Sequence, residues 1–494
     1  MEILNQNTKR SAMIGFLGIT LSLGQAQAVP AADIELIDGL SAEVLCQDPA
    51  GADGNLNVWD AKLDPLRNEL IISRANPNGL DFLALDLETN DGTAQGSGEA
   101  MECVNNTANP LVGQPFASQG MDFAPDGTFY FGVSNLFLGA WLDRNESGLG
   151  GQFRTFSTIP SIRGVVVRPD DGSLFATSNT KGAAPIFPNH VLKVNRGDGF
   201  FDSVYDTKQA VKALDVSALN TITDLAVTSQ GNFYVQYFPG ELVRKRPDGG
   251  FDMANNRANK GEIGGINEAA LATSPDDVVY HLDAATGRLF AIIEKEDPNA
   301  FPDIRLIGTG AGLQASSNSR AGLAAAENAL YLEMEDGRVI RIAADTESTV
   351  AGNSLRQVIG QDAGMATLDG VVTNESTGDP LADVQVSLQN GMKTTTAADG
   401  SYRFEGVPAG LQEIFFFREG FRSALEVQPL RDGQEAGPDV ALADFRPSQL
   451  ADGLQAEVLA LDNSAVQGSS DVMFDDDGNL YSMNFSTGTI TRTR

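Results

Sequence analysis

One short phrase recurs along this chain of 494 residues: an apolar strand, a tight turn, and a strand rich in aromatic residues. Four clear copies read GMDFAPDGTFYFG from Gly120, GVVVRPDDGSLFATS from Gly164, DLAVTSQGNFYVQYF from Asp224 and DVMFDDDGNLYSMNF from Asp471. Weaker copies lie near Asn57, Glu268 and Arg320. Self-similarity at a period of about 40–60 residues indicates a repeat architecture, and four-stranded units have about that period.

Each repeat continues beyond the phrase with a third strand and a more variable fourth segment. The third strands read HVLKVNR from His190, GELVRKR from Gly240, GRLFAII from Gly287 and GRVIRIA from Gly337. The strands alternate apolar and polar residues or run fully apolar, whereas helical periodicity is nearly absent. A unit of four antiparallel strands is a blade, and blades arranged radially around an axis form a β-propeller. The sequence therefore predicts an all-β propeller.

The repeats are interrupted once, from about residue 366 to residue 443. This segment contains a pattern of glycines, prolines and apolar residues that differs from the repeats: Gly370, Val372, Gly378, Pro380, Leu381, Val384, Val386, Thr396, Asp399, Gly400, Tyr402, Phe404 and the closing Val407 to Gly410. With these residues the segment resembles the carboxypeptidase regulatory-like (transthyretin-like) β-sandwich domain. The resemblance implies an inserted accessory sandwich with a carbohydrate-binding-like fold and without catalytic residues.

The number of blades depends on the two ends of the chain. DGLQAEVL from Asp452 nearly duplicates DGLSAEVL from Asp38, and the last repeat stops after its third strand at Arg494. An unpaired edge is a liability, so we expect residues 41–46 to complete the last repeat. This favours seven blades, with blades 1–6 at 35–362, the sandwich at 366–443 and the last blade at 446–494. The alternative is a six-bladed ring that ends near Gly360.

The N-terminus is typical of an export signal over residues 1–28. Lys9 and Arg10 precede a short apolar stretch, and Ala26 to Ala28 fit a cleavage site. An uncleaved membrane anchor is the alternative, and no later stretch is a candidate transmembrane helix. We expect a periplasmic or extracellular protein, in which Cys46 and Cys103 can form a disulfide. Two cysteines and two histidines are too few for the usual zinc frameworks.

The formal net charge of −32 constrains the partners. A surface this acidic repels phosphate backbones and disfavours nucleic-acid binding. It attracts divalent cations or basic partners, although solubility in salty surroundings is the preferred explanation of the charge.

The candidate ligand site is the mouth of the central channel, because ligands meet propellers there or at adjacent loops. Aligned on their turns, the repeats place seven residues near the entrances of the inner strands: Asn57, Gln119, Arg163, Asp224, Glu268, Arg320 and Asp471. The carboxylates suit Ca²⁺, whereas Arg163 and Arg320 suit a carboxylate or sugar acid. The alternative is a solvated channel wall whose arginines and acids neutralise one another. No cofactor is certain.

The repeats also resemble NHL-type, lactonase and streptogramin-lyase propellers, which would imply a catalytic His or a metal-binding set. The full motif of neither enzyme family is present, and Phe or Tyr stands where the lyase phrase has Trp. We interpret His190 and His281 as structural. The sequence therefore favours an exported, non-enzymatic protein that binds a carbohydrate, peptide or protein. The alternative is a metal-assisted hydrolase or lyase that uses Asp224, Glu268 and Asp471.

Overall fold

The structure of the chain is a computed structural model. The part that it describes comprises residues 29–48, 57–76, 79–89, 102–106, 118–133, 137–141, 153–157, 159, 162–178, 189–214, 219, 221–237, 241–255, 270–284, 286–315, 321–345, 354–360, 364–388, 391–431, 433–444, 469–474, 480–484 and 490–493. The expected export signal lies outside these residues. No helix within these ranges combines the length and apolar character needed to cross a membrane.

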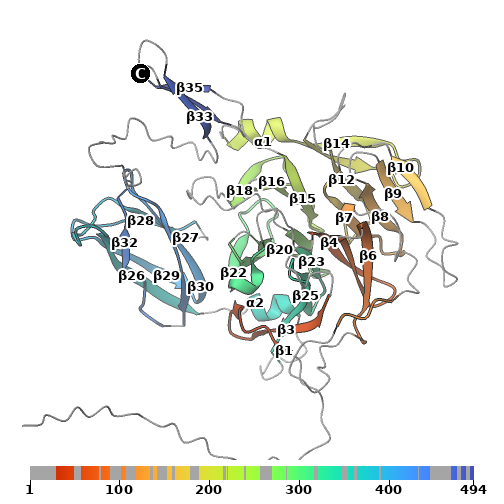
Figure 1. Cartoon of the computed structure of the whole chain (residues 1–494), viewed down its shortest axis with the longest axis horizontal. Coiled ribbons are helices and arrows are strands. Elements are labelled where there is room, and N and C mark those ends of the chain that lie inside the picture. Colours follow the sequence, from red (N-terminus) through yellow and green to blue (C-terminus); the bar gives the residue numbers. More distant parts are fainter. Residues whose placement is uncertain are drawn as a thin grey trace, which may run out of the picture.

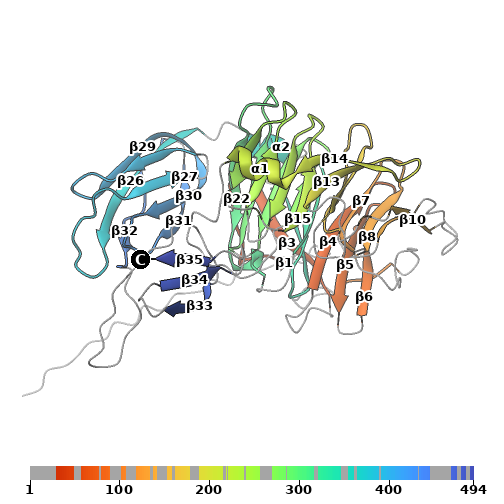
Figure 2. The same cartoon turned by 90° about the horizontal axis from the view of Figure 1, so that it is seen from above.

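Within the described residues, six antiparallel sheets stand around a common axis (Figures 1 and 2). Blade 1 has β4 (Asn57–Asp64), β5 (Glu69–Asn76) and β6 (Gly79–Asp86); blade 2 has β7 (Ser118–Phe123), β8 (Phe129–Val133), β9 (Phe137–Trp141) and β10 (Phe153–Ser157); blade 3 has β11 (Val165–Val167), β12 (Leu174–Ser178), β13 (His190–Val194) and β14 (Phe201–Asp206). Blade 4 has β15 (Ile222–Val227), β16 (Phe233–Tyr237), β17 (Leu242–Lys245) and β18 (Phe251–Asn255); blade 5 has β19 (Ala270–Thr273), β20 (Val278–Asp283), β21 (Arg288–Ile293) and β22 (Asp303–Thr309); blade 6 has β23 (Gly322–Ala325), β24 (Ala329–Glu333) and β25 (Arg338–Ala344). The propeller architecture predicted from the repeats is thus present.

The first strands of the six blades surround the axis, and each lies beside the next, from β4 through β7, β11, β15, β19 and β23 back to β4. These strands approach so closely that some positions have no room for a side chain. A Cβ on Gly120 would lie 2.6 Å from the Cα of Gly164, and one on Gly322 would lie 2.8 Å from the Cβ of Ala61. The glycines of the repeated phrase are therefore packing residues of the inner ring.

The ring closes with six blades, so the prediction that residues 41–46 complete a seventh blade is wrong. β3 (Leu40–Gln47) pairs antiparallel with β25 and supplies the fourth strand of blade 6. β1 (Val29–Pro30) adds to its outer edge. The repeat pattern does not identify the partner, because β25 and the strand at residues 490–493 are both third strands of a blade.

A disulfide between Cys46 and Cys103 reinforces this closure. Cys46 belongs to β3, whereas Cys103 lies in the segment that follows β6 of blade 1. The backbone N–H of Cys103 also donates to the Gln47 carbonyl at 2.9 Å. The bond thus covalently joins the last blade to the first.

The C-terminal repeat forms a separate three-stranded sheet of β33 (Ser469–Phe474), β34 (Leu480–Asn484) and β35 (Ile490–Thr493). Its first strand shifts register between Ser469 and Asp471, as β15 does between Ile222 and Asp224. The backbone of this sheet therefore keeps a feature of the blades. The duplicate at 452–459 lies outside the described residues.

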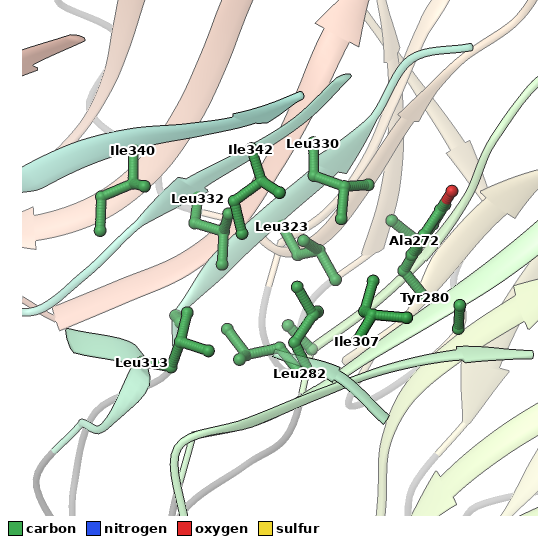
Figure 3. Packing of buried hydrophobic residues seen from close by; sticks show 14 of the residues in the cluster. Ala272, Tyr280, Leu282, Ile307, Leu313, Leu323, Leu330, Leu332, Ile340 and Ile342 are labelled. Atoms are coloured by element: carbon green, nitrogen blue, oxygen red, sulfur yellow. The ribbon is translucent and has the colours of Figure 1, made fainter. Parts of the chain in front are cut away.

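Apolar side chains between neighbouring blades form the core. The largest cluster joins blades 5 and 6 and includes Leu282, Ile307, Leu323, Leu332 and Ile340 (Figure 3). The short helix α2 (Leu355–Gly360) packs Leu355, Val358 and Ile359 into this cluster. α1 (Thr207–Leu214) and the 3₁₀ helix η3 (Ala311–Leu313) precede the first strands of blades 4 and 6.

The sandwich follows blade 6 in sequence and lies against blade 5 in space (Figure 1). One of its sheets has β27 (Gln385–Leu388), β28 (Lys393–Thr395), β30 (Gly410–Phe417) and β31 (Ala424–Leu430); the other has β26 (Met365–Asn374), β29 (Ser401–Pro408) and β32 (Val440–Leu442). Its core contains Leu368, Val384, Val386, Tyr402, Phe404 and Phe416. The alternating residues Val384, Val386 and Leu388 are all buried.

Candidate functional site

The seven predicted site residues are placed very unevenly. Arg163 directly precedes β11, and Asp224 lies inside β15. The backbones of Asn57, Gln119 and Asp471 lie in the first strands β4, β7 and β33, but their side chains are outside the described part. Glu268 and Arg320 lie outside the described residues altogether. The convergence of Asp224, Glu268 and Asp471 on one metal therefore stays a prediction.

Asp224 is buried and connects two blades through its carboxylate. Oδ1 accepts the backbone N–H of Leu225 at 2.8 Å, and Oδ2 accepts that of Leu271 in β19, also at 2.8 Å. A register shift in β15 stands directly before this residue. Such an irregularity turns a side chain away from the regular ladder, here toward the next blade.

The same arrangement occurs at two other junctions of the inner ring. Asp60 accepts the N–H groups of Ala61 and, in blade 2, Met121, both at 2.8 Å. Asp122 accepts those of Phe123 at 2.9 Å and, in blade 3, Val167 at 2.7 Å. We call Asp60, Asp122 and Asp224 the latch aspartates, because each hydrogen-bonds its own strand to the next blade.

Lys62 provides the positive charge for these acids. Its Nζ lies 2.9 Å from Asp60 Oδ1, and only 15% of the side chain is exposed. Burial lowers the pKa of Lys62. The carboxylates of Asp60, Asp224 and Asp122 raise it by more than burial lowers it, so the pKa lies above its usual value. The lysine is therefore firmly charged at neutral pH.

The carboxyl of Asp122 has a perturbed pKa. Burial raises its pKa, and Lys62 with the N–H groups of Val167 and Phe123 lowers it, which leaves the pKa at about 6. A group that titrates there can exchange a proton near neutral pH. Both carboxyl oxygens already accept main-chain hydrogen bonds, however, so the geometry is that of a structural connection between blades.

Among the predicted site residues with a described side chain, Arg163 best fits the role predicted for it, which is binding a carboxylate or sugar acid. Its backbone N–H donates to Thr177 Oγ1 at 3.0 Å, which holds the residue at the start of β11. The side chain is half-buried, and burial lowers the pKa of its guanidinium from the usual value. A partly desolvated guanidinium interacts strongly with a carboxylate.

Among the described residues, no three His, Cys, Asp or Glu side chains are grouped so that they could hold a metal ion. Lys62 and Asp122 were missed by sequence reasoning, as was Asp60. A sequence signal for the acids does exist: Asp is disfavoured in strands, yet it recurs inside three first strands in NVWDA, GMDFA and TDLAV. That recurrence indicates a common structural role.

The sandwich is joined to the propeller by main-chain and side-chain contacts. Leu411 of β30 pairs with Leu306 of β22, which makes one continuous nine-stranded sheet from blade 5 into the sandwich. Arg288 forms an ion pair with Glu413 at 3.1 Å, with side chains 11% and 4% exposed. Leu411 also packs in an apolar cluster with Ile304 and Leu306. The contact therefore combines main-chain pairing, a buried ion pair and apolar packing.

Residues 367–443 match the carboxypeptidase regulatory-like domain family. The sandwich that follows blade 6 is a carboxypeptidase regulatory-like domain. The resemblance drawn from Gly370 to Gly410 is thereby confirmed. Comparison of the chain with curated proteins finds no match.

Several solved structures resemble about two thirds of the chain, at low TM-scores. One, provisionally named a gluconolactonase, has a TM-score of 0.41 at 14% identity and covers 65% of this chain and 98% of its own. Virginiamycin B lyase from Staphylococcus aureus has a TM-score of 0.38 at 12% identity, covering 62% and 100%. An auxiliary nutrient binding protein from Bacteroides thetaiotaomicron has a TM-score of 0.40 at 10% identity, covering 62% and 76%.

Proposed function

We propose that this protein is an exported binding protein in which a closed propeller carries the carboxypeptidase regulatory-like domain as a fixed accessory module. The observation that carries the proposal is the continuous sheet from β22 into β30, together with the Arg288–Glu413 ion pair. A flexible tether would leave the two surfaces independent, whereas this contact fixes their relative orientation. Two fixed surfaces can engage one extended ligand together.

The ligand that we propose is an acidic carbohydrate bound at the mouth of the channel beside Arg163. A half-buried guanidinium favours a carboxylate, and a sugar acid supplies one on a polar ring. A protein ligand with an exposed carboxylate would use the same cation. Export is supported by the basic and apolar N-terminal sequence and by the Cys46–Cys103 disulfide, because disulfides persist in oxidising compartments.

The proposal is tested by calorimetric titration of the full chain with an oligogalacturonide and with its neutral counterpart. We expect binding of the acidic sugar only, and a loss of affinity of at least about tenfold in Arg163→Ala, the scale of one charged hydrogen bond. Arg168→Ala is the matched control, because Arg168 lies at the other end of β11 from Arg163 and pairs with Asp170 and Asp171 in the turn to β12. Equal binding of both sugars, or equal loss in both variants, would rule out a carboxylate site at Arg163.

The net charge of the chain adds a second criterion. Because the protein surface is strongly acidic, it opposes the approach of an acidic ligand, and salt screens that repulsion. The affinity for the acidic sugar should therefore rise with ionic strength over the low-salt range. A monotonic fall would instead indicate that attraction by a local cation outweighs the repulsion between the acidic surface and the sugar.

A further inference from the structure

Three polar side chains on the outer strands of blade 3 form a connected row. His190 Nδ1 lies 2.6 Å from Ser203 Oγ, and His190 Nε2 lies 3.5 Å from Asp206 Oδ1. His190 begins β13, while Ser203 and Asp206 belong to β14. The row thus has a hydroxyl, an imidazole and a carboxylate in the order that nucleophilic catalysis uses.

An irregularity in the β13–β14 ladder brings the three groups together. His190 pairs with Asp206 and Val191 with Tyr205, but Leu192 pairs with Ser203, so β14 has one extra residue, Val204. Val204 and Tyr205 both pack on the apolar cluster shared with blade 4. Ser203 therefore turns to the face that bears His190 and Asp206, whereas in a regular ladder it would oppose Lys193 on the other face.

The hydrogen bonds favour a hydroxyl that donates to the imidazole. The Ser203 hydroxyl has one proton, and His190 Nδ1 at 2.6 Å is a closer acceptor than the Tyr205 carbonyl at 3.4 Å. His190 is then the tautomer with its proton on Nε2, facing Asp206. Burial lowers the pKa of His190, Asp206 raises it and Lys208 lowers it, with a net decrease, so the ring is a neutral base at pH 7.

The neighbouring backbone fixes both ends of the row. Asp206 Oδ1 accepts the N–H of Lys208 at 2.9 Å at the start of α1, which orients the carboxylate. The hydroxyl of Thr207 donates to the carbonyl of Asn189 at 2.6 Å, which holds the residue before His190. Ser203 itself is exposed to solvent. The nucleophile is therefore accessible, whereas its base and the positioning carboxylate are partly buried.

We propose that Ser203, His190 and Asp206 form a serine esterase site for small, activated carboxylic esters on the outer face of blade 3. Ser203 Oγ attacks the ester carbonyl carbon while its proton passes to His190 Nδ1. The bond to the alcohol oxygen breaks, and that oxygen takes the proton from His190, leaving an acyl-serine. Water then attacks the acyl group, gives a proton to His190 and releases the acid; the proton returns to Ser203. This activity is independent of the proposed ligand site at Arg163.

The test is covalent labelling of the full chain with a fluorophosphonate, in which the serine oxygen displaces fluoride at phosphorus. We expect one labelled peptide containing Ser203, and a labelling rate at least about 100-fold lower in Ser203→Ala and His190→Ala, the scale of general-base catalysis. Ser401→Ala is the matched control, because Ser401 donates to Asp399 at 2.6 Å but has no imidazole in this contact. Its labelling should equal that of the unmodified protein.

Asp206→Asn tests the positioning residue and keeps an oxygen for the N–H of Lys208. Removing the charge lowers the pKa of His190 further, so the labelling rate should fall and its pH profile should move to lower pH. A folded protein that is not labelled overturns the proposal, as does labelling that survives His190→Ala. Circular dichroism of each variant separates loss of the site from loss of the fold.

Discussion

Three inner-ring junctions of the propeller add a hydrogen-bonded carboxylate to their apolar packing, whereas the junction between blades 5 and 6 has the largest apolar cluster. Between blades 1 and 2, 2 and 3, and 4 and 5, a latch aspartate accepts an N–H from the next blade. Between blades 5 and 6, a large aliphatic cluster includes Leu282, Leu323 and Leu332 (Figure 3). A hydrogen-bonded carboxylate is directional and fixes the register of two strands, whereas apolar packing is non-directional and tolerates adjustment.

The two kinds of junction should therefore respond differently to substitution and to pH. A carboxylate junction concentrates its energy in a few charged groups, so one substitution leaves buried partners uncompensated. An apolar junction loses packing in proportion to the volume removed.

The largest effect is expected for Asp60→Ala. The substitution removes the acceptor for Met121 N–H and the ion partner of the mostly buried Lys62. Loss of one partner of a buried pair costs about 3–5 kcal/mol, measured as the free energy of unfolding in urea. The double variant Asp60→Ala with Lys62→Met should recover part of this loss, because no lysine is then left without its ion partner Asp60. If the double variant is no more stable than the single one, Lys62 is not what makes Asp60 costly to remove.

A somewhat smaller effect is expected for Leu282→Ala in the apolar junction. Leu282 is fully buried, and a substitution of this kind costs about 2–5 kcal/mol, depending on how far the site collapses. Because the side chain of Leu282 makes no hydrogen bond or ion pair, the loss in the free energy of unfolding should be the same at pH 4.5 and pH 7. A strongly pH-dependent loss would show that the two kinds of junction are coupled.

The smallest effect is expected for Asp122→Asn, and it should appear mainly as a pH dependence. The pKa of Asp122 is about 6 in the folded chain and about 4 in an unfolded one. The folded state therefore binds this proton more tightly, so its stabilising contribution is full below about pH 4 and disappears as the pH rises to about 6. Urea unfolding from pH 4 to pH 7 should give a flatter stability profile for Asp122→Asn. An unchanged profile would contradict a raised pKa.

The propeller could be predicted from the sequence because its signal is local. Turns, alternation and period repeat within each blade, as in the phrases from Gly120 and Asp224. The partner of β3 could not be predicted, because the residues that it joins, such as Ala42 and Ile342, are far apart in sequence and any third strand offers a similar edge.

The candidate site was less predictable for the same reason. Asp224 was selected as a possible ligand, but its role depends on Leu271 in another blade. Likewise, no spacing indicates that Ser203 faces His190, because the extra residue Val204 decides which face Ser203 occupies. Sequence periodicity gives the strands, whereas local irregularities within the strands determine the chemistry.

The closing strand also orders events during folding. β3 is synthesised early, but its partner β25 begins about 290 residues later. β3 therefore has no pairing partner while the first five blades form. Contacts of such long range slow folding, and an unpaired strand invites aggregation. Formation of the Cys46–Cys103 disulfide by an oxidant of the exported compartment needs only N-terminal residues, because the two cysteines are 57 residues apart. An oxidised early intermediate would hold β3 beside blade 1, ready to receive the last blade, so strong reductant should slow refolding as well as lower stability.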